Sequence, residues 1–214
     1  MGIADNIRKL KSELPSTVEL VAVSKFKPVE AIREAYEAGQ RSFGENRPQE
    51  LAAKAPQLPG DIVWHFIGHL QTNKVKMVVP YAHLIHSVDS ERLLAEIDKA
   101  ACAAGKVMDC LLEIHIAEEQ TKQGFTPDEA VALAREAGRY PNIRLRGVMG
   151  MATFTDDREQ VRREFRSLKA VSERLSFLPG CDTVSMGMSG DWPVAVEEGT
   201  TIVRIGTAIF GKRN

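Results

Sequence analysis

A lysine that ends a predicted strand is the residue of this sequence best placed for covalent chemistry. Lys25 closes the β-rich segment Val18–Lys25, and Val21 and Val23 share its face because side chains alternate along a strand. If both valines fill an apolar core, the amine stands above it, where desolvation lowers a lysine pKa. A neutral amine can attack an aldehyde to form a Schiff base. A lysine in solvent at a strand end is the alternative, and the spacing alone favours that alternative.

Two segments near the C-terminus combine glycine with hydroxyl side chains at predicted strand ends. They are Thr183–Ser189, followed by G-D, and Ile202–Phe210, which reads I-V-R-I-G-T-A-I-F. Glycine lets backbone N–H groups approach an anion, and hydroxyl groups add donors. Ser185, Gly206 and Thr207 are therefore candidate phosphate ligands. Ordinary turns use the same residue types, so one such loop is weak support and two adjacent ones are stronger.

An arginine interrupts the last apolar segment. Arg204 has the same parity as Ile202 and Gly206, so the three side-chain positions lie on one face of a strand. A buried arginine needs a partner, which is either a structural ion pair or a bound ligand. The sequence leaves both interpretations open.

Composition excludes several other classes of function. Lys and Arg number 28 and Asp and Glu number 29, so the chain lacks the basic excess of a nucleic-acid-binding protein. It has no apolar run of about 20 residues for a membrane span and no apolar segment typical of a secretory signal. Three cysteines without C-x-x-C predict no disulfide framework and fit a reducing cytoplasm. Five histidines form no H-E-x-x-H motif, so no metal site is expected.

The elements that must position these residues alternate regularly between strand and helix. The predicted strands are Val18–Lys25, Ser42–Asn46, Val63–Gly68, Leu84–Val88, Asp109–Ala117, Arg144–Met151, Thr183–Ser189 and Ile202–Phe210. The predicted helices between them are Val29–Gly39, Pro48–Leu58, Asn73–Tyr81, Ser90–Gly105, Thr126–Tyr140, Asp156–Phe177 and Trp192–Glu198. Such βα units imply parallel strands joined by helical crossovers.

This pattern predicts an α/β fold, a single TIM-type (β/α)8 barrel that spans residues 1–214 as one domain. A doubly wound open sheet is the structural alternative. An extra amphipathic helix at Ile3–Leu14 is expected to cover the barrel seam or its bottom, and no helix is expected after the last strand. Active sites of such barrels lie at the C-terminal strand ends, where Lys25 and the two glycine-rich segments fall.

Six motifs, found in order along nearly the whole chain, carry a family resemblance. They are A-V-S-K at Ala22–Lys25, F-G-E-N at Phe43–Asn46, W-H-F-I-G-H-L-Q-T-N-K at Trp64–Lys74, R-G-V-M at Arg146–Met149, S-M-G-M-S-G-D at Ser185–Asp191 and V-R-I-G-T-A-I-F-G at Val203–Gly211. The chain resembles the pyridoxal phosphate homeostasis proteins, which share the barrel fold of the alanine racemase N-terminal domain.

The resemblance implies a pyridoxal 5'-phosphate (PLP) site. It implies that Lys25 holds the cofactor as a Schiff base, that Arg204 faces the pyridine nitrogen, and that Asn46 lies near the ring. Ser185, Gly206 and Thr207 would hold the phosphate. The cofactor-binding set implied in this way is Lys25, Asn46, Ser185, Met186, Arg204, Gly206 and Thr207. Lys122 matches a loop position that carries a lysine close to the site in the family.

Several positions depart from the pattern of the family at the rim of the expected site. Arg47 and Pro48 stand where an aromatic residue usually follows G-E-N, and His115 stands where asparagine is frequent. Trp192 and Pro193 replace the more usual methionine and acidic residue.

The resemblance also implies a carrier rather than an enzyme. A cation beside the pyridine nitrogen weakens the ring as an electron sink, and racemisation needs a base on each face of the substrate. Alanine racemases take their second base, a tyrosine, from a further domain, whereas Tyr36, Tyr81 and Tyr140 fall on predicted helices. We therefore expect no catalytic residue, cytoplasmic supply of PLP to apo-enzymes, and a monomer or weak homodimer.

Two enzymatic alternatives stay open. One is a small PLP-dependent amino-acid racemase or lyase that uses His115, at the end of a predicted strand, as its second base. The other is a phosphate-sugar isomerase or aldolase, which also combines a strand-end lysine with a phosphate site on this kind of barrel. That second reading fits the residues almost as well and is disfavoured only by the family motifs.

Overall fold

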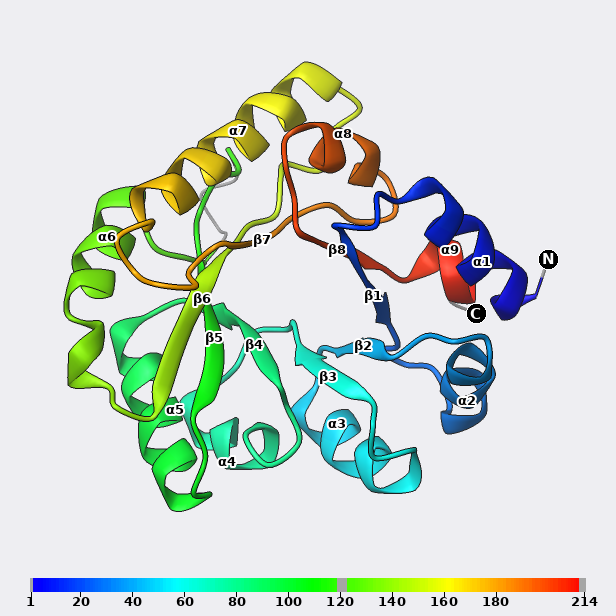
Figure 1. The fold of residues 1–214 in the computed structure, drawn as a ribbon, viewed down its shortest axis with the longest axis horizontal. Helices are drawn as coiled ribbons and strands as arrows, with labels where there is room; N and C mark the ends of the chain where they lie inside the picture. Colours follow the sequence, from blue (N-terminus) through cyan, green and yellow to red (C-terminus); the bar gives the residue numbers. More distant parts are fainter. Residues whose placement is uncertain (1, 119–122, 212–214) are drawn as a thin grey trace.

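The strands close into one parallel barrel with helices around its outside, seen in a computed structural model that describes residues 2–118 and 123–211 (Figure 1). In the described residues the strand order is β1-β2-β3-β4-β5-β6-β7-β8, and β1 pairs with β8 to complete the ring. The strands are β1 (Glu19–Val23), β2 (Ser42–Glu45), β3 (Val63–Phe66), β4 (Leu84–Val88), β5 (Met108–Glu113), β6 (Ile143–Met149), β7 (Thr183–Ser185) and β8 (Ile202–Ile205). The predicted closed barrel is confirmed, and the open-sheet alternative is wrong.

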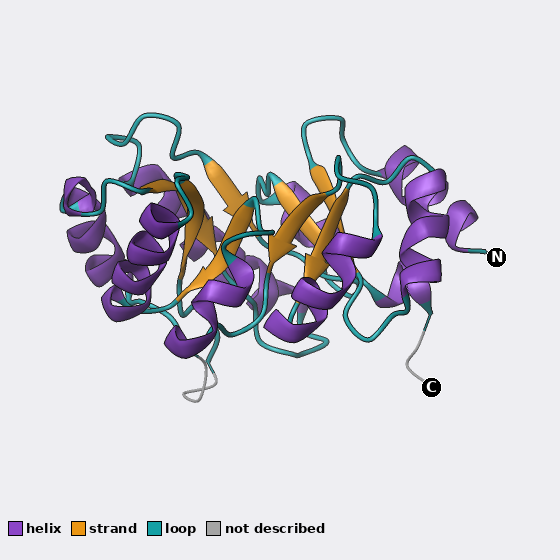
Figure 2. Cartoon of the chain, turned by 90° about the horizontal axis from the view of Figure 1, so that it is seen from below, coloured by secondary structure: helices purple, strands orange, loops and turns teal. Residues whose placement is uncertain are grey.

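Helices separate successive strands and flank them on both sides in a view from the edge (Figure 2). The α-helices are α1 (Ile3–Glu13), α2 (Val29–Glu37), α3 (Pro48–Lys54), α4 (Val75–Val78), α5 (Glu91–Ala103), α6 (Pro127–Arg135), α7 (Arg158–Arg174), α8 (Trp192–Glu197) and α9 (Thr207–Phe210). Short 3-10 turns are η1 (Ala55–Gln57), η2 (Thr72–Lys74) and η3 (Ala137–Arg139). No described helix is long and apolar enough to cross a membrane.

Local sequence signals explain where several helices begin. The hydroxyl of Ser90 accepts a hydrogen bond from the Leu93 amide and caps α5, as predicted. Thr126 and Glu129 form a reciprocal capping box at the start of α6, and Pro127 occupies the first helical position.

Strand parity divides the apolar residues into two groups. Alternate side chains on the outer faces of the strands pack against the helices in one large cluster that includes Ala22, Val203 and Ile205. The barrel interior holds a smaller cluster of Val21, Leu84, Leu111, Met149 and Ile202. The interior is therefore apolar only in part, and the rest of it is filled by the polar groups described below.

The chain after β8 differs from the prediction. The expected strand Ile202–Phe210 ends at Ile205, and Thr207–Phe210 forms α9. The Ile209 and Phe210 amides donate to the Gly206 carbonyl at 3.0 and 2.9 Å, so the backbone bonds locally instead of continuing the ladder. Ile209 is buried and gives the turn an apolar anchor.

Helix α1 lies beside α9 and α2, on the outside of the seam between the first and last strands (Figure 1). The Asn6 side-chain amide donates to the Ile209 carbonyl at 2.9 Å. Of the two positions expected for this helix, the seam is therefore the right one.

Candidate functional site

The C-terminal strand ends bring Lys25 to the mouth of the barrel. Val21 is completely buried in the interior cluster, as the alternation predicted. Strand β1 ends at Val23 rather than at Lys25, so the lysine lies in the turn that follows the strand and is half-buried. The Lys25 backbone thus lies directly above the barrel interior.

Arg204 on β8 lies inside the barrel and is 4% exposed. Its guanidinium donates to the Ser185 carbonyl at 2.9 Å, to the Ser185 hydroxyl at 2.5 Å and to the Gly150 carbonyl at 3.1 Å. Burial lowers the pKa of Arg204 to about 10, opposed by the negative charges of Glu113 and Asp191. A guanidinium has five N–H groups. The three protein contacts therefore leave donors for a ligand, and the group stays charged at neutral pH.

Glu113 is a candidate site residue that the sequence analysis missed. It ends β5 and is 7% exposed, and burial together with the nearby charge of Asp89 raises its pKa to about 7 while Arg204 opposes the rise. The predicted strand extended to Ala117, so Glu113 fell in its middle and was not recognised as a residue at a strand end. Its parity with Leu111, which faces the interior, was the available signal.

Two histidines connect the interior strands to the arginine. His65 on β3 and His86 on β4 lie 2.8 Å apart between Nδ1 and Nε2, and His86 Nδ1 lies 2.9 Å from the Ser185 hydroxyl oxygen. Burial, with the charges of His65 and Arg204, holds the pKa of His86 well below its usual range, so this ring is neutral. Among the described residues no His, Cys, Asp and Glu cluster could hold a metal ion.

The structure places Ser185 and Met186 in buried positions. The Ser185 hydroxyl is bonded to both Arg204 and His86, so it helps to orient the guanidinium. Met186 directly follows β7, and its side chain is completely buried in the cluster between barrel and helices. Strand alternation is the reason, because the residue after an inward-facing Ser185 must face outward.

The remaining predicted residues lie at strand exits around the mouth. Asn46 directly follows β2 and is half-buried, and its side-chain oxygen is buried with no hydrogen-bond partner among the described residues. Gly206 directly follows β8, and the exposed Thr207 begins α9. The amides of a first helical turn have no partner within the helix. These groups can serve a polar ligand: Asn46 as an acceptor, and Gly206 and Thr207 as donors.

The structure also shows where the rim residues that depart from the family pattern lie. The Arg47 guanidinium lies 4.5 Å from the centre of the Phe26 ring. Half-buried Trp192 begins α8, and the His115 amide donates to the Phe125 carbonyl at 3.0 Å. Lys122 lies outside the described residues.

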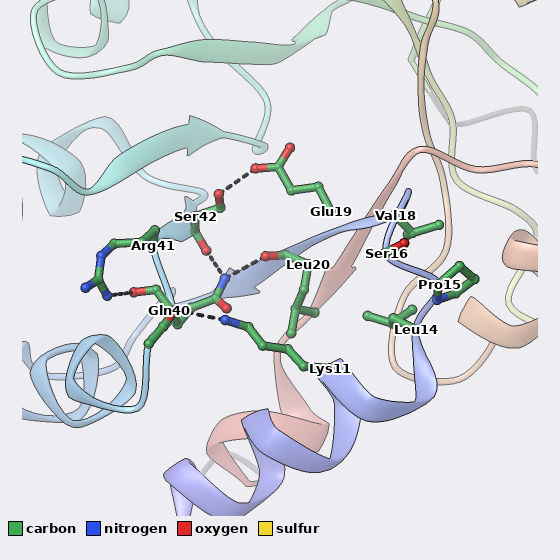
Figure 3. A pocket seen from close by; sticks show the side chains of 11 residues that line it. Lys11, Leu14, Pro15, Ser16, Val18, Glu19, Leu20, Gln40, Arg41 and Ser42 are labelled. Carbon is green, nitrogen blue, oxygen red and sulfur yellow. Dashed lines mark hydrogen bonds between the residues drawn. The ribbon is translucent and has the colours of Figure 1, made fainter.

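A cavity of about 410 Å³ lies at the other end of the barrel, between α1 and the first residues of β1 and β2 (Figure 3). Lys11, Glu19 and Arg41 are among its lining residues. Functional sites in this fold lie at the opposite, C-terminal strand ends. We therefore take the mouth around Lys25 and Arg204 as the candidate site.

Comparison with known proteins identifies the family. The family described as "Alanine racemase, N-terminal domain" matches residues 2–214. A pyridoxal phosphate homeostasis protein of Vibrio alginolyticus is 42% identical over 229 residues, which cover 100% of this chain and 98% of that protein. The chain belongs to the pyridoxal phosphate homeostasis protein family. The resemblance inferred from the six motifs is thereby confirmed.

Solved structures agree with this membership. PipY of Synechococcus elongatus PCC7942 with PLP bound has a TM-score of 0.89 and 38% identity, and the match covers 98% of this chain and 100% of that one. An alanine racemase of Clostridium difficile 630 has a TM-score of 0.81 at 16% identity and shares the fold. The match covers 99% of this chain and 57% of that enzyme, so the racemase continues beyond the region that the family shares.

Proposed function

We propose that this protein binds PLP at the barrel mouth, holds it through a Schiff base on Lys25, and supplies it to apo-enzymes in the cytoplasm. The observation that carries the proposal is the placement of a lysine and a buried guanidinium at the same end of one barrel. Support comes from the family, since PipY has been solved with PLP bound. A reactive aldehyde kept on a protein has a low free concentration, which is what homeostasis requires.

The residues present fit such a cofactor. Arg204 has N–H donors to spare for a ring nitrogen, and Asn46 has a buried oxygen without a partner. Gly206 and Thr207 provide backbone and hydroxyl donors for a phosphate. When bound, the cofactor supplies an aldehyde and an electron-withdrawing ring. The chain's own part is to hold the amine, the guanidinium and the phosphate donors in place, with Ser185 as the residue that orients Arg204.

We propose that the protein is a carrier without robust catalysis of its own, acting as a monomer or weak homodimer. The Tyr36 and Tyr140 hydroxyls donate to Asp61 and Glu91, each at 2.7 Å, on the outside of the barrel. Neither can serve as a second base at the mouth. A charged Arg204 also disfavours protonation of a ring nitrogen beside it, which weakens the electron sink.

The test is the visible absorption spectrum of the purified protein, before and after addition of PLP. We expect a yellow band in the parent and in Lys76→Ala, an exposed lysine on α4, and its loss in Lys25→Ala. A parent that stays colourless with added PLP would remove the cofactor proposal.

Carrier and enzyme are separated by incubating the loaded protein with amino acids in deuterated solvent. Little formation of the opposite enantiomer is expected, because inversion needs a base on the second face and the described Tyr36 and Tyr140 hydroxyls are bonded elsewhere. Rapid racemisation that depends on His115 would instead support the racemase or lyase alternative.

A further inference from the structure

The turn that carries Lys25 has a strained backbone. Among the described residues, Phe26 is the one non-glycine residue with a positive φ, at 62°. This left-handed conformation costs an L-residue enough to lower its population about tenfold. The Phe26 side chain is 46% exposed, so burial of its ring does little to offset that cost. Other contacts must hold the turn.

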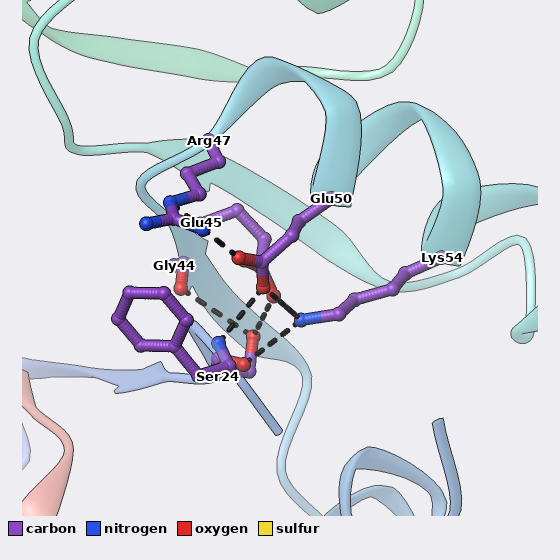
Figure 4. A network of polar contacts seen from close by, with 7 residues as sticks. Ser24, Gly44, Glu45, Arg47, Glu50 and Lys54 are labelled. Carbon is purple, nitrogen blue, oxygen red and sulfur yellow. Dashed lines mark hydrogen bonds and ion pairs between the residues drawn. The ribbon is translucent and has the colours of Figure 1, made fainter. Parts of the chain in front are cut away.

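Those contacts come from α3 and β2 and involve the two neighbours of Lys25 (Figure 4). The Phe26 amide donates to Glu50 Oε2 at 2.8 Å, and Lys54 Nζ donates to the Ser24 carbonyl at 3.0 Å. The Ser24 amide and hydroxyl donate to the Gly44 carbonyl at 2.9 Å and to Glu45 Oε1 at 2.6 Å. The backbone is thus fixed on both sides of Lys25.

Charge pairing holds the contacting side chains in position. Lys54 is 8% exposed, and its ammonium lies 2.9 Å from Glu45 Oε1 and 2.8 Å from Glu50 Oε2. Burial disfavours ionised Glu50, but hydrogen bonds from Lys54 and from the Phe26 amide outweigh burial and lower its pKa. The ionised carboxylate is a strong acceptor for the Phe26 amide. The Glu50 oxygen that holds the turn is therefore itself fixed by a nearly buried cation.

We propose that Glu50 and Lys54 are positioning residues for Lys25: they hold the left-handed turn at Phe26 so that the lysine amine meets the ligand aldehyde at the barrel mouth. The inference rests on the proposed function, because it assumes that Lys25 is the anchor. It assigns a role to α3, which contributes no residue to the predicted cofactor-binding set.

A comparison of two ligands distinguishes positioning of Lys25 from a general structural role. PLP needs the lysine amine, whereas 4-deoxypyridoxine phosphate has the ring and the phosphate but no aldehyde. In Glu50→Ala we expect PLP affinity, measured by the visible band, to fall about tenfold as the turn leaves its left-handed conformation. Affinity for 4-deoxypyridoxine phosphate, measured by fluorescence titration, should stay at the parent value.

Two further variants sharpen the test. Glu50→Gln keeps an oxygen that can accept from the Phe26 amide and should retain most of the affinity. Glu96→Ala removes a half-buried acidic residue that pairs with Lys99 at 3.7 Å on α5, and should match the parent for both ligands. Lys54→Met would leave Glu45 buried without its counter-charge and could unfold the chain, so the test rests on Glu50.

Each outcome supports or overturns the positioning role of Glu50. Selective loss of PLP affinity in Glu50→Ala, with rescue in Glu50→Gln, supports the inference. Equal loss for both ligands, or no loss for either, overturns it and leaves the proposed function in place. A parent that forms no band overturns the proposed function and the inference together.

Discussion

Replacement of Arg204 by methionine tests whether this arginine serves a ligand or the fold. Burial lowers the pKa of Arg204 from 12.5 to about 10. Since each tenfold change in a proton equilibrium is about 1.4 kcal/mol, keeping the charge buried costs about 3 kcal/mol. The side chain donates three hydrogen bonds, to Ser185 twice and to Gly150. At about 1 kcal/mol each, these contribute a similar amount in the opposite direction.

The two contributions nearly cancel, so Arg204→Met should change the free energy of unfolding by no more than about 1 kcal/mol. Methionine occupies a similar volume and leaves no large cavity. Glu113, whose charge acts on the guanidinium, has a pKa of about 7 and can take up a proton instead of remaining as an uncompensated buried charge. PLP affinity should fall much more, by roughly 10- to 100-fold, because a charged hydrogen bond to the ligand is lost.

Two measurements check this prediction: urea unfolding followed by circular dichroism, and titration with PLP followed by visible absorbance. Arg204→Lys keeps a positive charge but replaces the planar guanidinium with a compact ammonium group. Its PLP affinity should lie between those of the parent and Arg204→Met. A loss of stability above about 3 kcal/mol with unchanged PLP affinity would refute the reasoning and make Arg204 a structural residue.

Further predictions concern buried titratable groups and one glycine. Glu113→Gln should raise the free energy of unfolding at pH 8 by up to about 3 kcal/mol, because the folded protein holds a proton up to about pH 7 that the unfolded chain releases near 4.5. His86 has the opposite sign: the unfolded chain takes up a proton near pH 6.5 that the folded protein refuses, so stability is lost as the pH falls. Between about pH 4.5 and 6.5, Glu113 and His86 change the stability of the parent in opposite directions as the pH falls. Because Glu113→Gln keeps only the effect of His86, its urea midpoint should fall more steeply toward acid pH. Gly187→Ala should destabilise the folded protein by about 2 kcal/mol or more. The φ of Gly187 is +94°, and a Cβ at this position would lie 2.6 Å from the Cβ of Ala195. Gly190→Ala, which has open space around it, is the matched control in thermal melting.

Hydrophobic alternation and helix signals were enough to predict the barrel. Leu84–Val88 matches β4 residue for residue, and Ser90 and Pro127 mark the starts of α5 and α6. Helix α9 was missed because I-V-R-I-G-T-A-I-F reads as one apolar segment. The change from strand to helix is marked by the Gly206 carbonyl, which accepts from two following amides, and by the Thr207 carbonyl, which accepts from the Gly211 amide.

The candidate site was predicted less completely than the fold, for a physical reason. A shift of one residue in the pairing register of a strand exchanges its inner and outer faces. Lys25 and Arg204 were proposed because a chemically distinctive residue stands at a strand end or inside an apolar segment, whereas Asn46 was proposed only from the family resemblance. The Met186 side chain points outward by parity, and Glu113 was passed over although its parity points inward.

Contacts between strands were beyond sequence reasoning altogether. His65 and His86 are 21 positions apart, and His86 and Ser185 are 99 apart. Each is unremarkable alone as a polar residue in a β-rich segment. Their alignment depends on the register between β3, β4 and β7, which only the closed barrel fixes.

This polar chain explains why so little of the barrel interior is apolar. A row of large aliphatic side chains in place of His65, His86 and Ser185 would remove buried polar groups whose desolvation is unfavourable. It would also remove the hydroxyl partner of the Arg204 guanidinium and leave only the Ser185 and Gly150 carbonyls to orient it. Because each link is bonded to the next, the orientation of Arg204 is fixed before any ligand arrives, which lowers the entropy lost on binding. The barrel interior thus contains less apolar packing, and the Arg204 cation at the floor of the site is preorganised for a ligand.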